Sequence, residues 1–222
     1  MNRPLPVNVL VVAKAPVPGQ AKTRLAAAVG NDLAADIAAA ALQDTLDAVA
    51  AARVAARTVA LTGDLNLARC GPAIGSQLTA FTVIAQRGMD FADRLANAHL
   101  DAGVAGYPVL QIGMDTPQVS AGLIEECAMT LLDAPAVLGP ARDGGWWALG
   151  LHDPAAAACL RTVPMSRPDT GAVTLRALAR TGLEVRLLAT LSDVDHLADI
   201  DVVRRECPRD SRFGAVTATG GA

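Results

Sequence analysis

Hydrophobic residues in this chain gather in two alternating kinds of stretch. The first kind is a short, unbroken run rich in β-branched residues, which is typical of a strand buried on both faces of a sheet. The clearest example covers residues 7–13, where every residue but one is apolar. We expect strands of this kind at residues 7–13, 58–62, 81–85, 109–113, 136–139, 146–151 and 184–188.

Longer stretches with helical periodicity separate these runs. Residues 31–53 carry an apolar stripe through Leu33, Ile37 and Leu42, and Asn31 or Asp32 can cap the helix. Further helices are expected at residues 91–102, 120–132, 173–181 and 196–206. This alternation predicts a mostly parallel α/β sheet with right-handed crossovers, in which ligands bind beyond the carboxyl ends of the strands.

Length and composition indicate one domain. The chain has 222 residues, of which 52% are hydrophobic and 18% charged, so it can bury a full core without a disulfide or structural metal. We expect the domain to span residues 1–209. The polar segment at residues 210–222, rich in Gly, Thr and Ala, is expected to form a flexible tail.

Charge and cysteine usage exclude several classes of protein. A net charge of −3 and 3% aromatic residues offer neither the basic field nor the stacking platform of a nucleic-acid-binding protein. The four cysteines stand singly, without a C-x-x-C pair, which favours reduced, packed thiols over a zinc site. No apolar run approaches the ~20 residues of a membrane span, and the first residues lack the apolar core of a signal peptide. The expected location is therefore the cytoplasm.

The loop after the first expected strand concentrates positive charge. Residues 14–25 contain two prolines, a glycine and three cations, namely Lys14, Lys22 and Arg24. Cations at a strand's carboxyl end suit an anion such as the phosphates of a nucleotide. The segment is not a P-loop, because two residues separate Gly19 from the Lys-Thr pair. The alternative is a solvated connector whose charges have no ligand.

Three aspartates are candidate metal ligands. Asp115 stands just beyond the strand at residues 109–113, where a carboxylate can hold a hard divalent cation between diphosphate oxygens. It can equally cap a backbone turn. Asp193 and Asp195 precede the last expected helix. Either can serve as an N-cap, or one of them can complete a two-carboxylate site with Asp115.

A glycine pair and two tryptophans lie where the fifth and sixth expected strands meet. Asp143 and Gly144 form a strong hairpin signal, and Gly144 with Gly145 lets the backbone approach a ligand closely. The face of Trp146 or Trp147 can stack on a sugar or a base. Because adjacent strand residues point to opposite faces, at least one of the two is expected in the core.

Five ordered motifs between residues 7 and 200 together resemble a known family. They read K-A-P-x-P-G-x-x-K-T-R-L, G-x-D-x-x-x-R-L, G-x-D-x-P, G-P-x-x-D-G-G followed by two aromatic residues, and a late D-V-D. They resemble the bacterial arsenosugar-biosynthesis-type glycosyltransferases of the nucleotide-diphospho-sugar transferase superfamily. More distantly, the chain is similar to 2-phospho-lactate guanylyltransferases and molybdenum-cofactor nucleotidyltransferases.

The resemblance implies a fold and a set of site residues. The fold is GT-A-like, a Rossmann-like three-layer sandwich with a mainly parallel central sheet. The residues implied to bind the nucleotide are Lys14, Gly19, Lys22, Arg24, Gln86 and Arg94. Those implied to face the second substrate are Asp143, Gly144, Gly145, Trp146 and Ser166. Asp115 and Asp195 would hold Mg²⁺ or Mn²⁺, and Asp115, Lys22 and Arg24 would be catalytic.

The chain departs from this pattern at two points. Relatives tend to read W-S-T-P where this chain has Met165 to Pro168, so the second-substrate pocket is expected to differ. The D-x-D motif of the superfamily survives only as Gly113-Met114-Asp115, which leaves one carboxylate in place of two.

Three functions are compatible with these residues. The resemblance implies metal-dependent glycosyl transfer from a nucleotide-sugar to a small-molecule acceptor. The cationic loop instead favours nucleotidyl transfer from an NTP to a phosphorylated or acidic small molecule, because the departing pyrophosphate carries more charge. The third is a non-catalytic nucleotide-binding protein, against which the retained carboxylates count.

These three candidate functions share a geometric prediction. The carboxylates of Asp115 and Asp195 should face a common space of cation size, and both Lys22 and Arg24 should reach the phosphates. The loop from Asp143 to Trp146 should line the pocket opposite the cationic loop, across Asp115.

Overall fold

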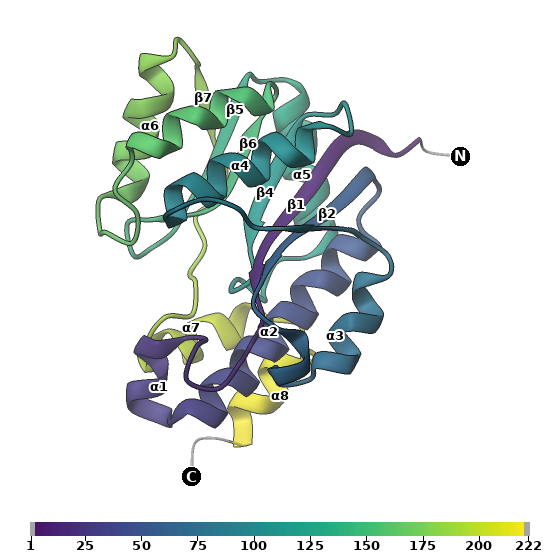
Figure 1. The fold of residues 1–222 in the computed structure, drawn as a ribbon, viewed down its shortest axis with the longest axis vertical. Helices are drawn as coiled ribbons and strands as arrows, with labels where there is room; N and C mark the ends of the chain where they lie inside the picture. Colours follow the sequence, from purple (N-terminus) through teal and green to yellow (C-terminus); the bar gives the residue numbers. More distant parts are fainter. Residues whose placement is uncertain (1–2, 220–222) are drawn as a thin grey trace.

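A seven-stranded sheet runs through the part of the chain that the computed structural model describes, residues 3–219 (Figure 1). Its strands are β1 (Leu5–Lys14), β2 (Val54–Thr62), β3 (Thr82–Ala85), β4 (Val109–Gly113), β5 (Ala136–Pro140), β6 (Trp146–Leu151) and β7 (Val185–Leu187). Their order is β3-β2-β1-β4-β6-β5-β7, and β6 alone runs antiparallel to its neighbours. The mainly parallel α/β sheet predicted from the sequence is confirmed.

The strand β1 lies in the interior of the sheet, between β2 and β4, and is buried on both faces. Val9 and Val11 point into the apolar cluster on one face, whereas Leu10 and Val12 point into the cluster on the other. The unbroken β-branched run of this segment reflects that double burial, because each face of a central strand needs its own apolar residues.

Helices cover both faces of the sheet. One face packs against α2 (Asn31–Ala51), α3 (Gly71–Leu78) and α5 (Ala121–Leu132). The other packs against α4 (Phe91–Gly103), the 3-10 helix η2 (Pro154–Thr162) and α6 (Thr170–Arg180). A short 3-10 helix, η1 (Leu65–Leu67), lies before α3. Within residues 3–219, no helix combines the length and hydropathy that crossing a bilayer requires.

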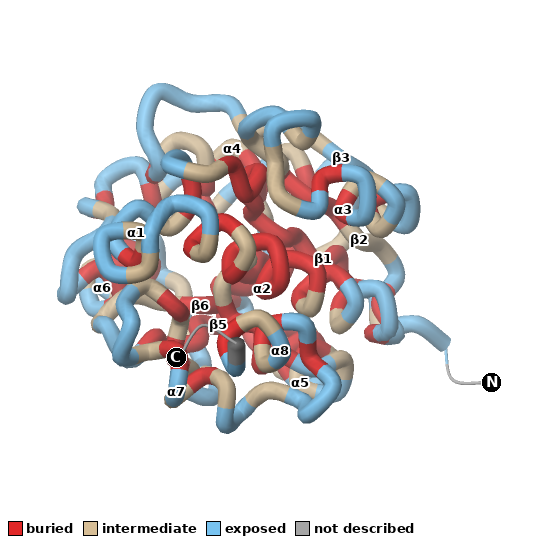
Figure 2. Tube along the Cα trace, turned by 90° about the horizontal axis from the view of Figure 1, so that it is seen from below, coloured by how far each residue is buried: buried red, intermediate tan, exposed pale blue. Residues whose placement is uncertain are grey.

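A third apolar cluster gathers three more helices around α2. These are α1 (Thr23–Val29), α7 (Leu197–Glu206) and α8 (Arg212–Thr219), grouped at the lower end of the molecule in Figure 1. Figure 2 shows the resulting burial of α2. Small alanine side chains make this possible, because they let neighbouring backbones approach α2 from several sides.

The cap expected for α2 is wrong. The N-cap residue is Gly30, and no side chain caps the helix. Asn31 is the first helical residue, and the carboxylate of Asp32 instead pairs with Arg69 at 2.6 Å. The Asp32 side chain, which local sequence would assign to the cap, is thus engaged in an ion pair with a residue distant in the sequence.

The expected flexible tail differs from the structure over residues 212–219, which form helix α8. Phe213 is completely buried in the third apolar cluster. Its backbone N–H donates to the Asp44 carboxylate at 2.9 Å, and the guanidinium of Arg212 pairs with Asp44 and Asp47 at 3.2 and 2.6 Å. A single large apolar side chain therefore anchors a segment whose composition resembles a tail. Residues 220–222 lie outside the described residues.

Replacing Phe213 with alanine should destabilise the protein by about 3 kcal/mol, because it empties a buried aromatic site. Urea unfolding at pH 7.5 measures the change in the free energy of unfolding. Arg209→Ala, at an exposed position just before α8, is the control and should stay near the wild-type value. A loss below 1 kcal/mol for Phe213→Ala would contradict the docking of α8.

His99 should make stability fall in mild acid. It is fully buried in α4, neither ring nitrogen has a partner among the described residues, and burial lowers its pKa to about 3. In the unfolded chain a histidine binds its proton near pH 6.5, so between these two values the unfolded state binds more protons. Stability therefore decreases as the pH is lowered.

Urea unfolding at pH 7.5 and pH 5.5 tests this dependence on His99. Wild type should lose about 1.4 kcal/mol more than His99→Leu between the two values. The exposed His152 gives the matched control, His152→Leu, which should follow wild type. Equal losses for His99→Leu and wild type would contradict a neutral buried imidazole.

Candidate functional site

A pocket of about 400 Å³ opens at the carboxyl end of the central strands. Its floor comes from the ends of β1 and β4, and its walls come from the start of α4, the β5–β6 hairpin and the segment at residues 165–170. This is the edge at which open parallel sheets bind ligands, because the loops that follow the strands diverge there.

Three carboxylates converge on one side of this pocket. Asp115 follows β4, while Asp193 and Asp195 come from the extended segment that leads into α7. Each offers one carboxylate oxygen, and these three oxygens lie within 4.8 Å of one another. The structure thus brings Asp115 and Asp195 together as the sequence predicts, and it adds Asp193, which sequence reasoning had left as an alternative to Asp195.

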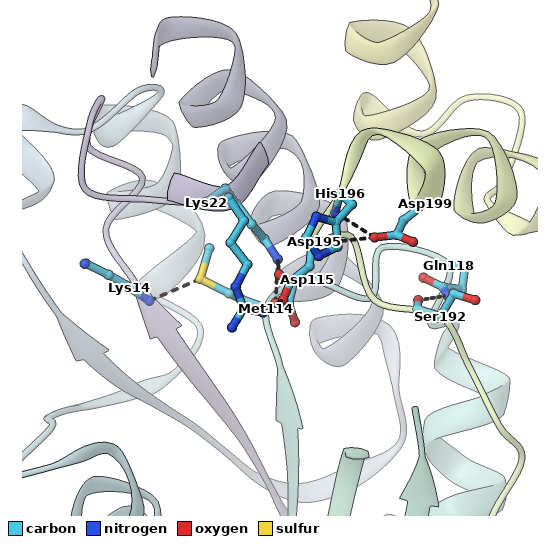
Figure 3. A network of polar contacts seen from close by, with 10 residues as sticks. Lys14, Lys22, Met114, Asp115, Gln118, Ser192, Asp195, His196 and Asp199 are labelled. Atoms are coloured by element: carbon cyan, nitrogen blue, oxygen red, sulfur yellow. Dashed lines mark hydrogen bonds and ion pairs between the residues drawn. The ribbon is translucent and has the colours of Figure 1, made fainter. Parts of the chain in front are cut away.

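The segment carrying Asp193 and Asp195 is tied to the sheet on either side. The backbone N–H of Val194 donates to the Asp115 carbonyl at 3.3 Å, and Gln118 donates to the carbonyl of Ser192 at 2.6 Å. Further along, Asp199 accepts from the backbone N–H groups of Asp195 and His196 at 3.0 and 2.6 Å (Figure 3).

His196 is therefore the N-cap of α7. The alternative in which Asp193 or Asp195 caps that helix is wrong, because Asp199 reaches back to cap it instead.

Lys22 lies between two of the carboxylates. Its Nζ donates to Asp115 Oδ2 at 2.7 Å and to Asp195 Oδ1 at 2.9 Å, and the side chain is 10% exposed (Figure 3). Burial by itself would lower the pKa of Lys22, but the two carboxylates raise the pKa above its ordinary value. The ammonium group therefore stays charged at every physiological pH.

The backbone of Lys22 is strained. With φ 46° and ψ 49° it is left-handed at the N-cap of α1, a conformation that costs a residue with a side chain roughly 1 to 2 kcal/mol. The ion pairs with the carboxylates offset this cost, so the loop geometry and the carboxylate cluster depend on each other.

The three other predicted nucleotide-binding residues of the loop at residues 14–25 occupy different environments. Arg24 pairs with Asp195 Oδ2 at 3.0 Å and stays half-exposed in the pocket wall. Lys14 also lines the pocket, and its Nζ donates to the Gln20 carbonyl at 2.7 Å. Gly19 forms an exposed turn with φ 75° and is not a lining residue. Lys22 and Arg24, expected on phosphates, thus make their observed ion pairs with aspartates.

The cluster carries more negative than positive charge. Burial, together with the carboxylates of Asp115, Asp143 and Asp195, raises the pKa of Asp193 to about 6, and Lys22 opposes this only in part. The Asp193 carboxylate has no ion-pair partner within residues 3–219. A divalent cation would relieve this repulsion, and three carboxylate oxygens are the donors that hard divalent cations prefer.

The hairpin loop faces the pocket through Asp143 and Gly145, which both line it. Asp143 Oδ1 accepts from the Gly145 N–H at 2.7 Å and closes the turn. Gly144 has φ 90° and does not line the pocket; a Cβ there would collide with the Pro168 carbonyl. The glycine allows the hairpin to approach the 165–171 segment, to which it is joined by the bond from Gly171 N–H to Gly144 O at 2.8 Å.

The two tryptophans separate as the strand geometry predicts. Trp147 is buried in the core, and its Nε1 donates to the Ala189 carbonyl at 2.8 Å. Trp146 lines the pocket, where its Nε1 lies 3.2 Å from Thr174 Oγ1. Ser166 lines the pocket as well and has φ 59°, the left-handed region that serine rarely adopts.

Two further predicted nucleotide-binding residues, Gln86 after β3 and Arg94 in α4, also line the pocket. Gln86 donates to the carbonyls of Ala13 and Ala60 at 2.8 and 2.9 Å, so its amide joins β1 to β2 at the pocket edge. Arg94 lies over the Phe91 ring at 5.8 Å and has no ion-pair partner within the described part of the chain.

Sequence reasoning missed Gln111. It is 2% exposed, lines the pocket, and its Oε1 has no hydrogen-bond partner among residues 3–219. The signal was present, since a glutamine interrupts an otherwise apolar strand run between Leu110 and Ile112. A buried amide without a partner is destabilising, which points to pairing with a ligand.

Comparison with known proteins identifies the family. A family model described as an uncharacterised protein conserved in bacteria, DUF2064, matches residues 45–167. The chain belongs to the DUF2064 family. The match covers α4, β4 and the β5–β6 hairpin, so it includes Asp115 and most of the pocket. A search of curated proteins finds no match.

Solved structures share the fold of this DUF2064 protein. A candidate nucleotide-diphospho-sugar transferase from Desulfovibrio desulfuricans G20 has 28% identity over 96% of this chain and 94% of that one, with a TM-score of 0.85. CMP:2-keto-3-deoxy-manno-octonic acid synthetase complexed with CTP has 13% identity, coverage of 90% and 97%, and a TM-score of 0.55. Rv0371c from Mycobacterium tuberculosis H37Rv, in complex with manganese, has 17% identity, coverage of 89% and 97%, and a TM-score of 0.54. The fold is thus that of the nucleotide-diphospho-sugar transferases.

Replacing Gln111 with methionine, which has a similar shape and no polar atoms, should stabilise the protein without ligand by about 1 kcal/mol. Urea unfolding measures the change. Gln118→Met is the matched control, because it removes the amide bonded to Ser192 and should lower stability. A loss of stability in Gln111→Met would mean that the amide is satisfied within the folded protein.

Proposed function

We propose that this DUF2064 protein is a metal-dependent transferase that acts on a nucleotide-activated donor. The observation that carries the proposal is the meeting of three carboxylates with the cationic first loop at one pocket on the carboxyl edge of the sheet. Transfer from a nucleotide donor requires both kinds of charge, because the leaving diphosphate is anionic and must be neutralised as its bond breaks.

Asp115, Asp193 and Asp195 would together hold Mg²⁺ or Mn²⁺. Their oxygen donors suit a hard divalent ion. Burial and the neighbouring carboxylates raise the pKa of Asp193, and such an ion would offset the negative charge. When bound, the ion supplies positive charge to the leaving diphosphate. The manganese complex of a protein with the same fold supports this assignment.

The first loop would bind the phosphates. Arg24 lines the pocket with an exposed guanidinium, which can bind a phosphate in a fork, while Lys14 and Lys22 act as point charges. Gln86, just after β3, and Arg94, in the first turn of α4, would contact the rest of the nucleotide. In Arg94 the buried Nε has no partner among the described residues, so it is available to a ligand acceptor.

The opposite wall would hold the second substrate. Trp146 offers an aromatic face, and Asp143, Gly145 and Ser166 line the pocket around it. The Gln111 amide on the floor would hydrogen-bond a polar group of the ligand, which compensates its burial.

Glycosyl transfer to a small acceptor is the first candidate reaction, as the resemblance to arsenosugar-type glycosyltransferases implies. Nucleotidyl transfer from an NTP is the second. The specific observation in its favour is the density of cations in the first loop, which suits departing pyrophosphate. Proteins of the same fold include a synthetase crystallised with CTP.

Product analysis separates the two reactions. The protein is incubated with nucleotide-sugars, NTPs and an acceptor library in the presence of Mg²⁺ or Mn²⁺. Glycosyl transfer releases a nucleoside diphosphate from a sugar donor. Pyrophosphate from an NTP, with no nucleoside diphosphate from any sugar donor, would instead select nucleotidyl transfer. Nucleotide binding without either product would leave a non-catalytic binding protein.

Asp115→Asn should reduce turnover by about a hundredfold or more, because it removes a ligand of the proposed ion without changing the side-chain shape. Initial rates and circular dichroism are measured in parallel. Asp210→Asn, at an exposed position remote from the pocket, is the control and should keep full activity. Full activity in Asp115→Asn would contradict the proposed role.

A further inference from the structure

The position of the Lys22 ammonium group is the starting observation. It donates to one oxygen of Asp115 and one of Asp195, at 2.7 and 2.9 Å, and it is nearly excluded from solvent. These carboxylates are two of the three that would hold a divalent ion in the proposed function, on which this inference rests. Two of the three carboxylates would thus serve both cations.

The two cations would compete for the cluster. A divalent ion bound to the Asp115 carboxylate lies about 2.0 to 2.6 Å from its oxygen. The Lys22 ammonium nitrogen lies 2.7 Å from Asp115 Oδ2. A divalent ion on that oxygen would therefore lie within about 5 Å of the ammonium nitrogen. In a partly buried site, repulsion between charges at this separation is weakly screened.

We infer that Lys22 and the divalent ion are alternative occupants of the carboxylate cluster, so that metal binding displaces the Lys22 side chain. The ammonium group holds the cluster together when it is paired there. An incoming divalent ion takes over that role with twice the charge, and Lys22 leaves.

The structure offers space to the displaced side chain. A second pocket of about 270 Å³ adjoins the first and is lined by Lys22, Arg24 and Met114, among other residues. Both pockets share Lys14, Arg24 and Asp115 as lining residues, so Lys22 can turn from the carboxylates toward the same cleft.

The exchange couples the metal to the anionic ligand. While Lys22 is paired with Asp115 and Asp195, its charge is not available to phosphate oxygens. Once displaced, it is available to them, so metal binding should raise the affinity for phosphate groups and, by reciprocity, phosphate groups should raise the affinity for metal. Lys22 is in this sense a positioning residue that links the two halves of the site.

The chain offers a direct test, because Lys14 and Lys22 are its only lysines. Wild-type protein is treated briefly with an amine-acetylating reagent, with and without saturating Mn²⁺, and acetylation is measured by peptide mass spectrometry. Lys14, which is exposed, serves as the internal reference and should react equally in both samples. Lys22 should be protected without Mn²⁺ and should react about tenfold faster with it.

A second measurement uses Mn²⁺ alone, followed by the electron paramagnetic resonance signal of the free ion. Lys22→Met should bind Mn²⁺ about tenfold more tightly than wild type, because the competing ammonium group is gone. Lys14→Met removes the same charge from the same loop and should bind as wild type does. Lys22→Arg keeps the charge and should bind as weakly as wild type. The acetylation experiment uses wild-type protein alone, so it still tests the exchange if Lys22→Met folds poorly.

The outcomes distinguish this inference from the function on which it rests. Binding of Mn²⁺ with unchanged Lys22 acetylation, and with no tighter binding in Lys22→Met, would overturn the exchange and leave the metal site intact. Absence of Mn²⁺ binding from wild type and from Lys22→Met would overturn both.

Discussion

The ion-pair cluster of Lys22, Asp115 and Asp195 is the interaction on which the pocket depends. It joins three segments that are far apart in the sequence, namely the first loop, the end of β4 and the approach to α7. Two carboxylates this close together would repel each other and destabilise the loops, so a cation between them is required. The left-handed backbone of Lys22 is a strain that this arrangement offsets.

The third apolar cluster makes that meeting possible. The helix α1, which begins next to Lys22, packs against α2 through residues such as Leu25. The helix α7, which begins close to Asp195, joins the same cluster through Val203 and packs against α1 and α8. Phe213 from α8 closes the same cluster. Because α2 is largely alanine along this surface, the helices approach it closely enough to bring the loops into ion-pair distance. The pocket edge of the sheet is thus held by packing on the side away from the pocket.

The pocket has two chemically different ends. One carries the carboxylates and the first-loop cations, where charge is concentrated and partly compensated. The other combines aromatic and apolar walls with single polar groups, of which Gln111 Oε1 and Arg94 Nε have no hydrogen-bond partner within residues 3–219. Such a division suits a donor with an anionic centre and a less polar remainder, since each part meets a surface of its own kind.

The sequence by itself determined the sheet, its approximate strand positions and the loops that line the pocket, because hydrophobic periodicity and strand-end residues are local properties. It also singled out Asp115 as a candidate metal ligand and placed one tryptophan in the core. Only the tertiary structure decided that Asp193 and Asp195 both join Asp115, and that Lys22 lies on carboxylates. It also decided that residues 212–219 fold as a helix. Each of these depends on which distant segments pack together, and the burial and charge of a distant neighbour leave no mark on local sequence.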